Sequence, residues 1–278
     1  MLVAIGDLVA DLIVLGGAGL ERGTDNPAEV RLTRGGSAAN VAMAAAPRHP
    51  SRFIGRVGDD TLARALVGEL ETAGVDVRVQ QEGRTGSIVV LVDAVGERTM
   101  ITDRGAAAEL GPIDPAWLDG AEWVHLPLYG FSSPSSRKAV TDAATLAAAR
   151  GARLSLDLSS VATLRDLGEV ELARLLRDLR PDVVFANEDE ARTAAELGLG
   201  PQGVYVVKRG PEAVRVTAGG ETRDVPVERV DDVLDSTGAG DAFAAGYIVA
   251  ALEGADPCES ARAGSVLAMS ALRRPGAL

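Results

Sequence analysis

The clearest candidate for chemistry is a glycine-rich stretch directly before an apolar run. Residues 235–241 read Asp-Ser-Thr-Gly-Ala-Gly-Asp, and the run that follows predicts a helix over 238–252. Small residues at a helix start leave backbone N–H groups open to a ligand, and the helix dipole favours an anion there. We therefore expect Gly238, Ala239 and Gly240 to bind a phosphate group. Asp241 is itself negative, so its expected role is to accept a proton from a hydroxyl group beside that phosphate.

A second candidate opens another helix, predicted over 37–46. Residues 34–40 read Arg-Gly-Gly-Ser-Ala-Ala-Asn. The pair Gly35-Gly36 permits a close approach of the backbone to a ligand. Asn40 is an unfavourable residue one turn inside a helix, so its amide is expected to have a specific partner. For both stretches a structural explanation stays open. In this alternative, Ser236 or Thr237 caps a helix, and Asn40 is an exposed residue after a glycine turn.

Polar residues also stand near the ends of two predicted strands. Asn187 and Glu190 lie three residues apart, and therefore share one face of a predicted helix over 188–197. An N-terminal cap with an acidic first turn explains them equally well. Lys208 follows the apolar run 204–207.

Alternating strand and helix patterns place these motifs in an α/β protein. A mostly parallel sheet with helices on both faces is expected, because each strand is followed by a helix. Two segments break the alternation, at about 11–33 and 87–103, and predict a small antiparallel sheet that covers the site as a lid. We expect one domain over 1–278. Strands are predicted at 2–5, 52–57, 123–126, 154–158, 182–185 and 204–207, and further helices at 61–73, 135–150, 170–179 and 257–272.

Composition excludes several function classes. The 278 residues carry 28 Lys and Arg against 40 Asp and Glu, a net charge of −12 that disfavours nucleic-acid binding. The single cysteine, Cys258, rules out an internal disulfide and a cysteine-based zinc cluster. No apolar run reaches the length of a membrane span, and the N-terminus lacks the basic region of a signal peptide. A cytoplasmic location, away from membranes, is therefore expected.

These stretches together resemble the ribokinase family, the carbohydrate kinases that include the B-type phosphofructokinases. The resemblance spans residues 2–277 in order. Asp157-Leu158-Ser159-Ser160 departs from the Asp-Pro-Asn that the family often has. The other matching segments are Gly6-Asp7 with Asp11, residues 53–60, Gly96-Glu97 with Arg104-Gly105-Ala106, Asn187 with Glu190, Lys208-Arg209-Gly210, and 274–277.

The resemblance implies an ATP-dependent kinase that phosphorylates a hydroxyl group of a sugar or sugar derivative. Asp241 would be the catalytic base, with an ordinary pKa near ~4. The remaining roles are implied as follows: Asp11, Gly35, Gly36, Asn40 and Arg104 bind the substrate; Asn187, Lys208, Gly210, Gly238 and Gly240 bind ATP; Glu190 lies near Mg²⁺ through water; and Asp235 is a possible ligand of a monovalent cation, whose site the chain end at Leu278 is expected to leave incomplete.

There are three alternative functions, of which the first lies within the same family. A nucleoside kinase of the same family needs an aromatic surface for its base, and residues 8–34 contain no aromatic residue, which favours a sugar. A non-catalytic sugar- or nucleotide-binding regulator is disfavoured by the intact Asp241 and its glycine loop. A dinucleotide-dependent oxidoreductase is excluded because no Gly-x-Gly-x-x-Gly follows the first strand. Family members also use the lid sheet to form dimers, so a homodimer is a further expectation.

Overall fold

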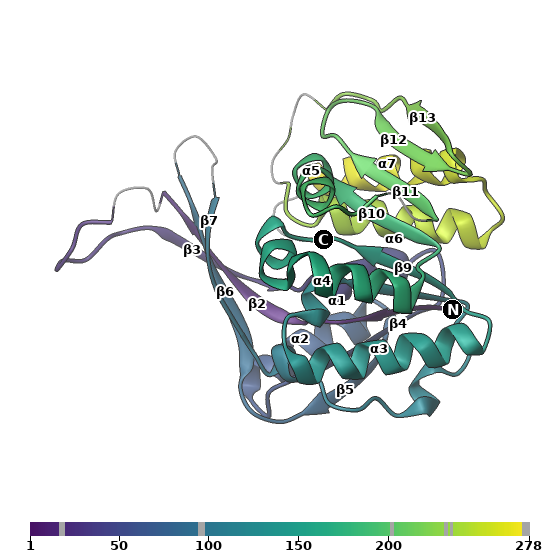
Figure 1. Ribbon diagram of the computed structural model, residues 1–278. Coiled ribbons are helices and arrows are strands. Elements are labelled where there is room, and N and C mark those ends of the chain that lie inside the picture. Colours follow the sequence, from purple (N-terminus) through teal and green to yellow (C-terminus); the bar gives the residue numbers. More distant parts are fainter. Residues whose placement is uncertain (17–19, 94–97, 201–202, 231–232, 234–235, 274–278) are drawn as a thin grey trace.

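The main sheet runs through the whole protein in the computed structural model, which describes residues 1–16, 20–93, 98–200, 203–230, 233 and 236–273 (Figure 1). Its strand order is β13-β12-β11-β10-β9-β8-β1-β4-β5. Neighbouring strands from β5 to β11 are parallel, and β12 and β13 add an antiparallel hairpin at one edge. The strands are β1 (Leu2–Ile5), β4 (Ser51–Val57), β5 (Asp76–Gln81), β8 (Trp123–Pro127), β9 (Arg153–Asp157), β10 (Val183–Asn187), β11 (Val204–Lys208), β12 (Val214–Ala218) and β13 (Glu221–Val225).

Helices cover both faces of this sheet, because alternate strand residues point to opposite sides. Leu2 and Ala4 pack in one apolar core, and Val3 and Ile5 pack in the other. The first core is closed by α1 (Ser37–Ala45), α2 (Thr61–Thr72), α6 (Ala239–Leu252) and α7 (Pro257–Leu272); the second by α3 (Pro134–Ala149), α4 (Val161–Leu179) and α5 (Glu188–Glu196), which lie in front in Figure 1. Three short 3₁₀ turns are η1 (Ala106–Glu109), η2 (Pro115–Leu118) and η3 (Leu128–Phe131).

The predicted α/β architecture is confirmed, and three edge strands were missed. β5 lies at the edge of the sheet, and all of its residues are at least partly exposed. Its sequence therefore lacks the continuous apolar run of a central strand. β12 alternates apolar and polar residues, whereas β13 is polar and exposed except for Val225, and the two strands are joined by Gly219-Gly220. Both glycines have positive φ, 59° and 84°, which is the conformation of a tight hairpin turn. Helix α4 also begins earlier than predicted, at Val161. Gly168 interrupts the helical sequence pattern, so only the part after it was predicted, but the helix continues across this glycine with a kink.

The two segments that interrupt the alternation form a second, smaller sheet of order β3-β2-β6-β7. Its strands are β2 (Val9–Leu15), β3 (Glu29–Gly35), β6 (Thr85–Val92) and β7 (Arg98–Gly105). Both predicted hairpins are antiparallel, whereas the central pair β2–β6 is parallel, because the two strands leave the main sheet in the same direction. The predicted turn residues Gly96 and Glu97 lie outside the described residues.

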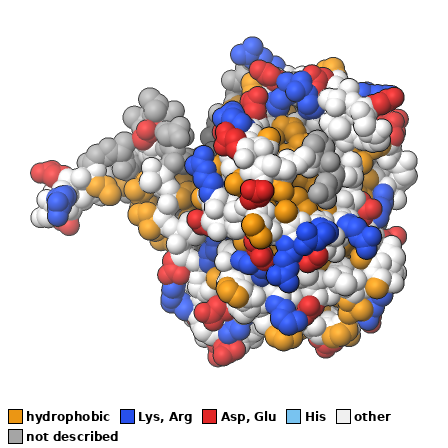
Figure 2. Space-filling view, in the orientation of Figure 1, with side chains coloured by type: hydrophobic (Ala, Val, Ile, Leu, Met, Phe, Trp, Pro, Cys, Tyr) orange, Lys and Arg blue, Asp and Glu red, His pale blue; other side chains and the backbone are white. Residues whose placement is uncertain are grey.

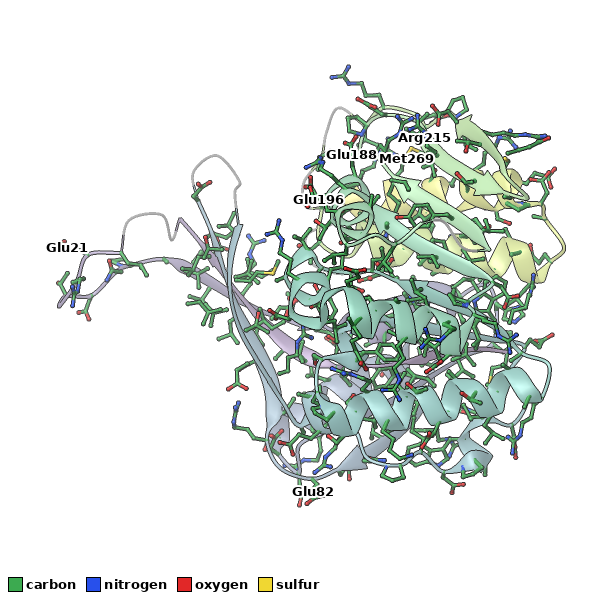
Figure 3. All side chains as sticks on the ribbon, viewed as in Figure 1. Glu21, Glu82, Glu188, Glu196, Arg215 and Met269 are labelled. Carbon is green, nitrogen blue, oxygen red and sulfur yellow. The ribbon has the colours of Figure 1, made fainter. Side chains whose placement is uncertain are left out.

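The small sheet projects away from the main sheet (Figure 1). Glu21 lies at the far end of this projection (Figure 3). Its backbone N–H donates to the Asn26 side chain at 2.7 Å, which closes the loop between β2 and β3. Among the helices of the described residues, none combines the length and the apolar character needed to span a bilayer.

Candidate active site

Three polar side chains meet where parallel strands of the main sheet end. Asp157 ends β9, Asn187 ends β10 and Lys208 ends β11. Asn187 is paired with Lys208 in the strand register, and Asp157 lies one strand further, beside Phe185. Because the carboxyl ends of parallel strands share one edge, ligands of open α/β sheets bind there. The strand ends therefore place an acid, an amide and an ammonium group at the usual position of an active site.

Two helix N-termini face the same edge. Helix α6 begins after Gly238, which has a left-handed backbone (φ 73°), so the cap position is the glycine and not Ser236 or Thr237. Helix α1 begins after Gly36 (φ 103°), where a Cβ atom would lie 2.4 Å from the Asp7 carbonyl oxygen. A side chain at Gly36 is therefore excluded by both strain and contact. The first-turn N–H groups of a helix have no partner within their helix. Two of them are used elsewhere, since the Ala39 N–H donates to the Asp7 carbonyl oxygen at 3.4 Å and the Ala239 N–H to the Ser236 carbonyl oxygen at 3.3 Å.

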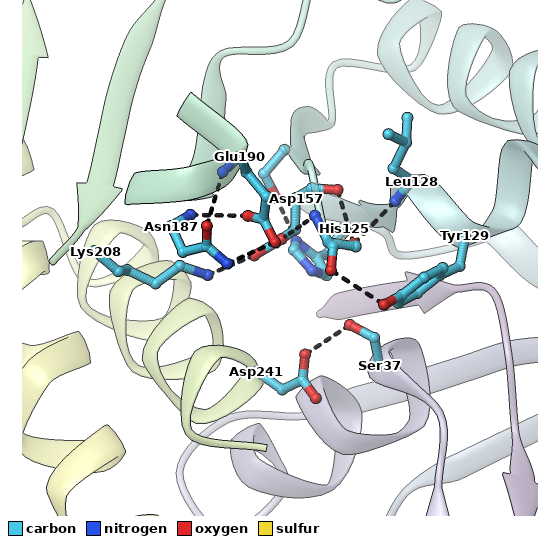
Figure 4. Close-up of polar contacts among 11 residues, drawn as sticks. Ser37, His125, Leu128, Tyr129, Asp157, Asn187, Glu190, Lys208 and Asp241 are labelled. Carbon is cyan, nitrogen blue, oxygen red and sulfur yellow. Dashed lines mark hydrogen bonds and ion pairs between the residues drawn. The ribbon is translucent and has the colours of Figure 1, made fainter. Parts of the chain in front are cut away.

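Asp241 connects the two helices through its carboxylate (Figure 4). The Ser37 hydroxyl donates to Oδ1 of Asp241 at 2.6 Å, and the Asn40 amide donates to Oδ2 at 2.8 Å. The Asn40 carbonyl oxygen accepts from the buried Arg34 guanidinium. Both ends of the Asn40 amide are therefore used, and the side chain is 4% exposed. The prediction of a specific partner for Asn40 is confirmed, and the alternative of an exposed residue is wrong.

The environment of Asp241 changes its acidity. Burial, with a smaller contribution from the nearby Asp157 carboxylate, raises the pKa of Asp241 to about 6, against the hydrogen bonds from Ser37 and Asn40 that lower it. The expectation of an ordinary pKa near ~4 is therefore wrong, because it took no account of desolvation. A base with this pKa is still ionised at neutral pH, and it is a better proton acceptor than a solvated aspartate.

Lys208 lies at the centre of an acidic cluster. Its Nζ donates to Oδ2 of Asp157 at 2.8 Å, and its pKa is raised by Asp157 and Glu190 against the effect of burial. A Cβ atom at Gly240 would lie 3.3 Å from the same Nζ. The ammonium group thus stands directly beside the glycine loop that begins α6, where a bound phosphate would meet it. Lys208 is therefore not an ordinary solvated lysine at a strand end, since its side chain is only 17% exposed.

Asn187 and Glu190 form a capping box at the start of α5. Oδ1 of the Asn187 side chain accepts from the Glu190 backbone N–H at 2.8 Å. The Glu190 carboxylate accepts from both the backbone N–H and the side-chain amide of Asn187, each at 2.8 Å. The structural explanation of this pair is therefore confirmed. Burial and Asp157 raise the pKa of Glu190 to about 7. The combined negative charge of Asp157, Glu190 and Asp241 exceeds the positive charge of Lys208. The cluster therefore favours an added cation.

On the other side of Asp241 lies Asp11, which belongs to β2 of the small sheet. Its carboxylate lies in close contact with the backbone at Gly35, because a Cβ atom there would lie 2.3 Å from Oδ1 of Asp11. Burial and the neighbouring Asp7 raise the pKa of Asp11 to about 6, and Arg34 lowers it. The structure therefore brings together the predicted residues Asp11, Gly35, Gly36, Asn40, Gly238, Ala239, Gly240, Asp241, Asn187, Glu190 and Lys208 along one edge.

Two predicted residues, Gly210 and Arg104, have surroundings other than those expected. Gly210 is an exposed residue two positions after β11, in the turn toward β12. Arg104 is not part of the solvated surface, since its guanidinium is paired with Asp7. Asp235 and the closing segment 274–277 lie outside the described residues.

The sequence reasoning assigned no role to Asp157, Asp7 or Ser37. Asp157 stood in a segment noted only for its departure from a family pattern. The signal that identifies it is an acidic residue near the end of the predicted strand 154–158, since Asn187 and Lys208 also stand near the ends of predicted strands. Ser159 next to it has a left-handed backbone (φ 57°), a conformation that asparagine also tolerates.

Comparison with known proteins agrees with this geometry. The sequence pattern of the pfkB family carbohydrate kinases matches residues 1–278. An ATP-dependent ribose-1-phosphate kinase of Halopiger xanaduensis is 34% identical over 271 residues, covering 89% of this chain and 87% of the relative. A fructokinase of Escherichia coli is 32% identical over 261 residues, covering 86% and 83%. The crystal structure of adenosine kinase from Sinorhizobium meliloti superposes with a TM-score of 0.87 at 25% identity, covering 99% of this chain and 94% of that one.

Proposed function

Because the chain belongs to the pfkB family of carbohydrate kinases, we propose that it transfers the γ-phosphoryl group of ATP to a hydroxyl group of a sugar or sugar derivative. The observation that carries this proposal is Asp241, which stands between two groups of residues. On one side Lys208 adjoins the glycine loop of α6, and on the other Asn40 joins Asp241 to the helix that follows Gly35-Gly36. Phosphoryl transfer needs alignment and charge stabilisation above all, and this arrangement supplies both.

In the proposed reaction the acceptor hydroxyl lies near Asp11, Asn40 and Asp241. Its oxygen forms a bond to the γ-phosphorus while the bond from that phosphorus to the bridging oxygen of ADP breaks. Asp241 takes the hydroxyl proton. The amides of Gly240 and Asp241, with Lys208, stabilise the charge that spreads over the transferring group. Ser37 and Asn40 hold the carboxylate in one orientation, so little reorganisation is required during transfer.

The residues present fit a magnesium ion that is bound together with ATP. Mg²⁺ prefers carboxylate oxygens and keeps several of its waters. Within the described part of the chain no group of three acidic, histidine or cysteine side chains converges on one point. Glu190 and Asp157 instead supply excess negative charge beside Lys208, which suits an ion held through water. When bound, the ion would neutralise phosphate charge. Asn187 holds Glu190 in place for that role.

The test of this function is a panel of sugars and nucleosides incubated with ATP, with ADP release as the measurement. Sugars are expected to be turned over, and the same panel with the Asp241→Asn variant gives the background. Absence of ADP release above that background for every compound would contradict the kinase assignment. The likeness to an adenosine kinase structure keeps a nucleoside acceptor as the second candidate, and faster turnover of nucleosides than of sugars would establish it.

The acidity of the site predicts a pH dependence. Asp11 and Asp241 have pKa values of about 6 and must be ionised to accept hydrogen bonds and the proton. We therefore expect kcat/KM for the acceptor to be constant above about pH 7 and to fall as the pH is lowered through 6, where the carboxylates become protonated. A profile measured from pH 5 to 9 in constant ionic strength tests this. Activity that persists unchanged to pH 5 would show that neither group titrates there.

We also propose that the small sheet is the lid over the acceptor and a dimer interface. Asp11 and Ile13 on one face of β2 are buried, so this face points toward the site. The opposite face carries apolar residues on all four strands, and the strand register places these residues side by side. Several of them are exposed: Leu32 is 62% exposed and Ile101 60%. The apolar residues of this outer face are Leu12, Val14, Val30, Leu32, Val89, Leu91 and Ile101, and orange side chains are visible along the projection in Figure 2.

A charge on this outer face is expected to separate the dimer. Leu32→Asp should give the mass of a single chain by light scattering at micromolar concentration, while the wild type gives twice that mass. Val170→Asp is the matched control, since Val170 is an exposed apolar residue of α4, far from the small sheet in sequence, with 83% exposure. A wild type that is monomeric at this concentration would remove the dimer and leave the lid untouched.

A further inference from the structure

An ion pair joins the small sheet to the main sheet at the acceptor side of the site. Arg104, near the end of β7, donates from Nη1 to Oδ2 of Asp7 at 2.9 Å, and Asp7 follows β1. The Arg104 guanidinium also lies over the Tyr129 ring, 4.0 Å from its centroid. Asp7 is 5% exposed. The positive charge of Arg104 is therefore already compensated by Asp7. The guanidinium group contacts both this carboxylate and the Tyr129 ring.

The same region contains carboxylate oxygens that lack donors. Oδ1 of Asp7 and Oδ1 of Asp11 are buried and have no hydrogen-bond partner within the described residues. Buried polar atoms are normally paired, so these two oxygens call for hydrogen-bond donors. The hydroxyl groups of a polyol are such donors. A phosphate dianion or a carboxylate offers acceptors instead, and it would add negative charge beside two carboxylates.

The position of Asp7 shows that it belongs to the acceptor side. Its carbonyl oxygen abuts Gly36, as the Asp11 carboxylate abuts Gly35. Burial raises the pKa of Tyr129, and the charges of Asp7 and Asp241 add to this effect against that of Arg104. Arg34, the other arginine of this region, is bound to Asn40 and lies 3.9 Å from Glu69, so it is occupied as well.

From these contacts we infer that Asp7, through its ion pair with Arg104, selects uncharged polyhydroxy acceptors and excludes acceptors that carry a phosphate or a carboxylate. The inference rests on the proposed function and narrows its substrate class. Asp7 is a specificity residue here because it supplies an acceptor oxygen and neutralises the Arg104 guanidinium, which would otherwise attract an anionic substrate. A B-type phosphofructokinase activity, with a phosphorylated fructose as acceptor, is correspondingly excluded.

The test compares the wild type, Asp7→Asn, Arg104→Gln and the double variant on matched acceptors. Ribose is paired with ribose 1-phosphate, and fructose with fructose 6-phosphate, and kcat/KM is measured for each. The wild type is expected to prefer the uncharged member of each pair. Asp7→Asn releases the guanidinium and should shift the preference toward the phosphorylated member by about 10-fold to 100-fold, mainly through KM. The double variant should lose this shift, and KM for ATP should stay constant throughout.

Arg104→Gln keeps the inference falsifiable if Asp7→Asn does not fold, as thermal unfolding would reveal. It leaves Asp7 unpaired, so it should bind phosphorylated acceptors no better than the wild type. A selective loss of phosphorylated acceptors in Arg104→Gln, or a wild type that prefers them, would overturn the inference and assign Arg104 to anion binding. Calorimetric binding of the acceptors separates the two proposals: a protein that binds uncharged sugars but releases no ADP contradicts the kinase function alone.

Discussion

Replacing Asp241 with Asn is expected to lower kcat by about 10²-fold to 10⁴-fold, the usual contribution of a general base. The substitution preserves shape and hydrogen bonding. The new amide oxygen accepts from Asn40, and the new NH₂ group donates to the Ser37 hydroxyl, which can rotate to accept. What is lost is the carboxylate that takes the acceptor proton. ATP affinity, measured by calorimetry on the same preparation, is expected to stay equal or to rise slightly, because a negative charge beside the phosphates is removed.

The same substitution is expected to stabilise the fold at neutral pH. The pKa of Asp241 rises from 3.8 to about 6 on folding, chiefly through burial. Between about pH 4 and pH 6 the folded protein therefore binds a proton that the unfolded chain has lost, and the free energy of unfolding falls as the pH rises through this window. Above pH 6 the folded state carries the full cost of the buried charge. Asn has no such charge, so urea unfolding at pH 7.5 should give a higher free energy for the variant.

Asp142→Asn is the control for both measurements, since Asp142 is an exposed residue of α3 whose ion pair with Lys138 is solvated. It should change neither kcat nor the free energy of unfolding appreciably. A folded Asp241→Asn protein that binds ATP and retains most of its turnover would refute the assignment of the base, and with it the proposed mechanism.

The parts of this protein that sequence reasoning predicted well are those with strong local signals. The central strand β1 is a continuous apolar run, β10 is apolar up to its last residue Asn187, and the helix starts at Gly36 and Gly238 lie in glycine-rich turns. The edge strands β5 and β13, and β12 beside β13, were missed because part of each strand is exposed to solvent, so their sequence patterns resemble those of loops. Local patterns thus identified the elements, while the sheet edges depended on tertiary contacts.

The candidate site divides in the same way. Asp241, Asn40 and Lys208 could be found from their positions at helix starts and strand ends. Their partners could not, because Ser37 and Asp241 are 204 residues apart and meet only when α1 packs on α6. The raised pKa of Asp241 and the pairing of Arg104 with Asp7 are consequences of burial and long-range contact. No spacing in the sequence carries that information.

Replacing Lys208 with Met is expected to have the second large effect, on both stability and ATP binding. The Lys208 side chain is 17% exposed and its partner Asp157 is 7% exposed, so the pair is largely buried. Removing one partner of a buried ion pair leaves an uncompensated charge, at a cost of about 3–5 kcal/mol in the free energy of unfolding. Glu190, whose pKa is already about 7, loses its neighbouring cation as well.

The chain supplies an exact counterpart for this experiment, because it has only two lysines. Lys138 is a 78% exposed residue of α3, paired with Asp142 across one helical turn, and Lys138→Met should change stability by less than about 0.5 kcal/mol. The deficit of Lys208→Met should shrink as the pH is lowered from 8 to 6. In that range the folded variant takes up protons on the cluster that the unfolded chain does not, so its free energy of unfolding rises relative to pH 8.

A structural role and a phosphate-binding role of Lys208 are separated by the double variant Asp157→Asn with Lys208→Met. Removing the Asp157 charge relieves the uncompensated carboxylate, so the double variant should recover much of the lost stability. It should not recover ATP binding, because the ammonium group beside Gly240 is still missing. A charge-assisted contact contributes about 1.5–3 kcal/mol, which corresponds to a loss of roughly 10-fold to 100-fold in kcat/KM for ATP. If the double variant regains wild-type kcat/KM for ATP together with stability, Lys208 acts only through Asp157 and does not meet the phosphates.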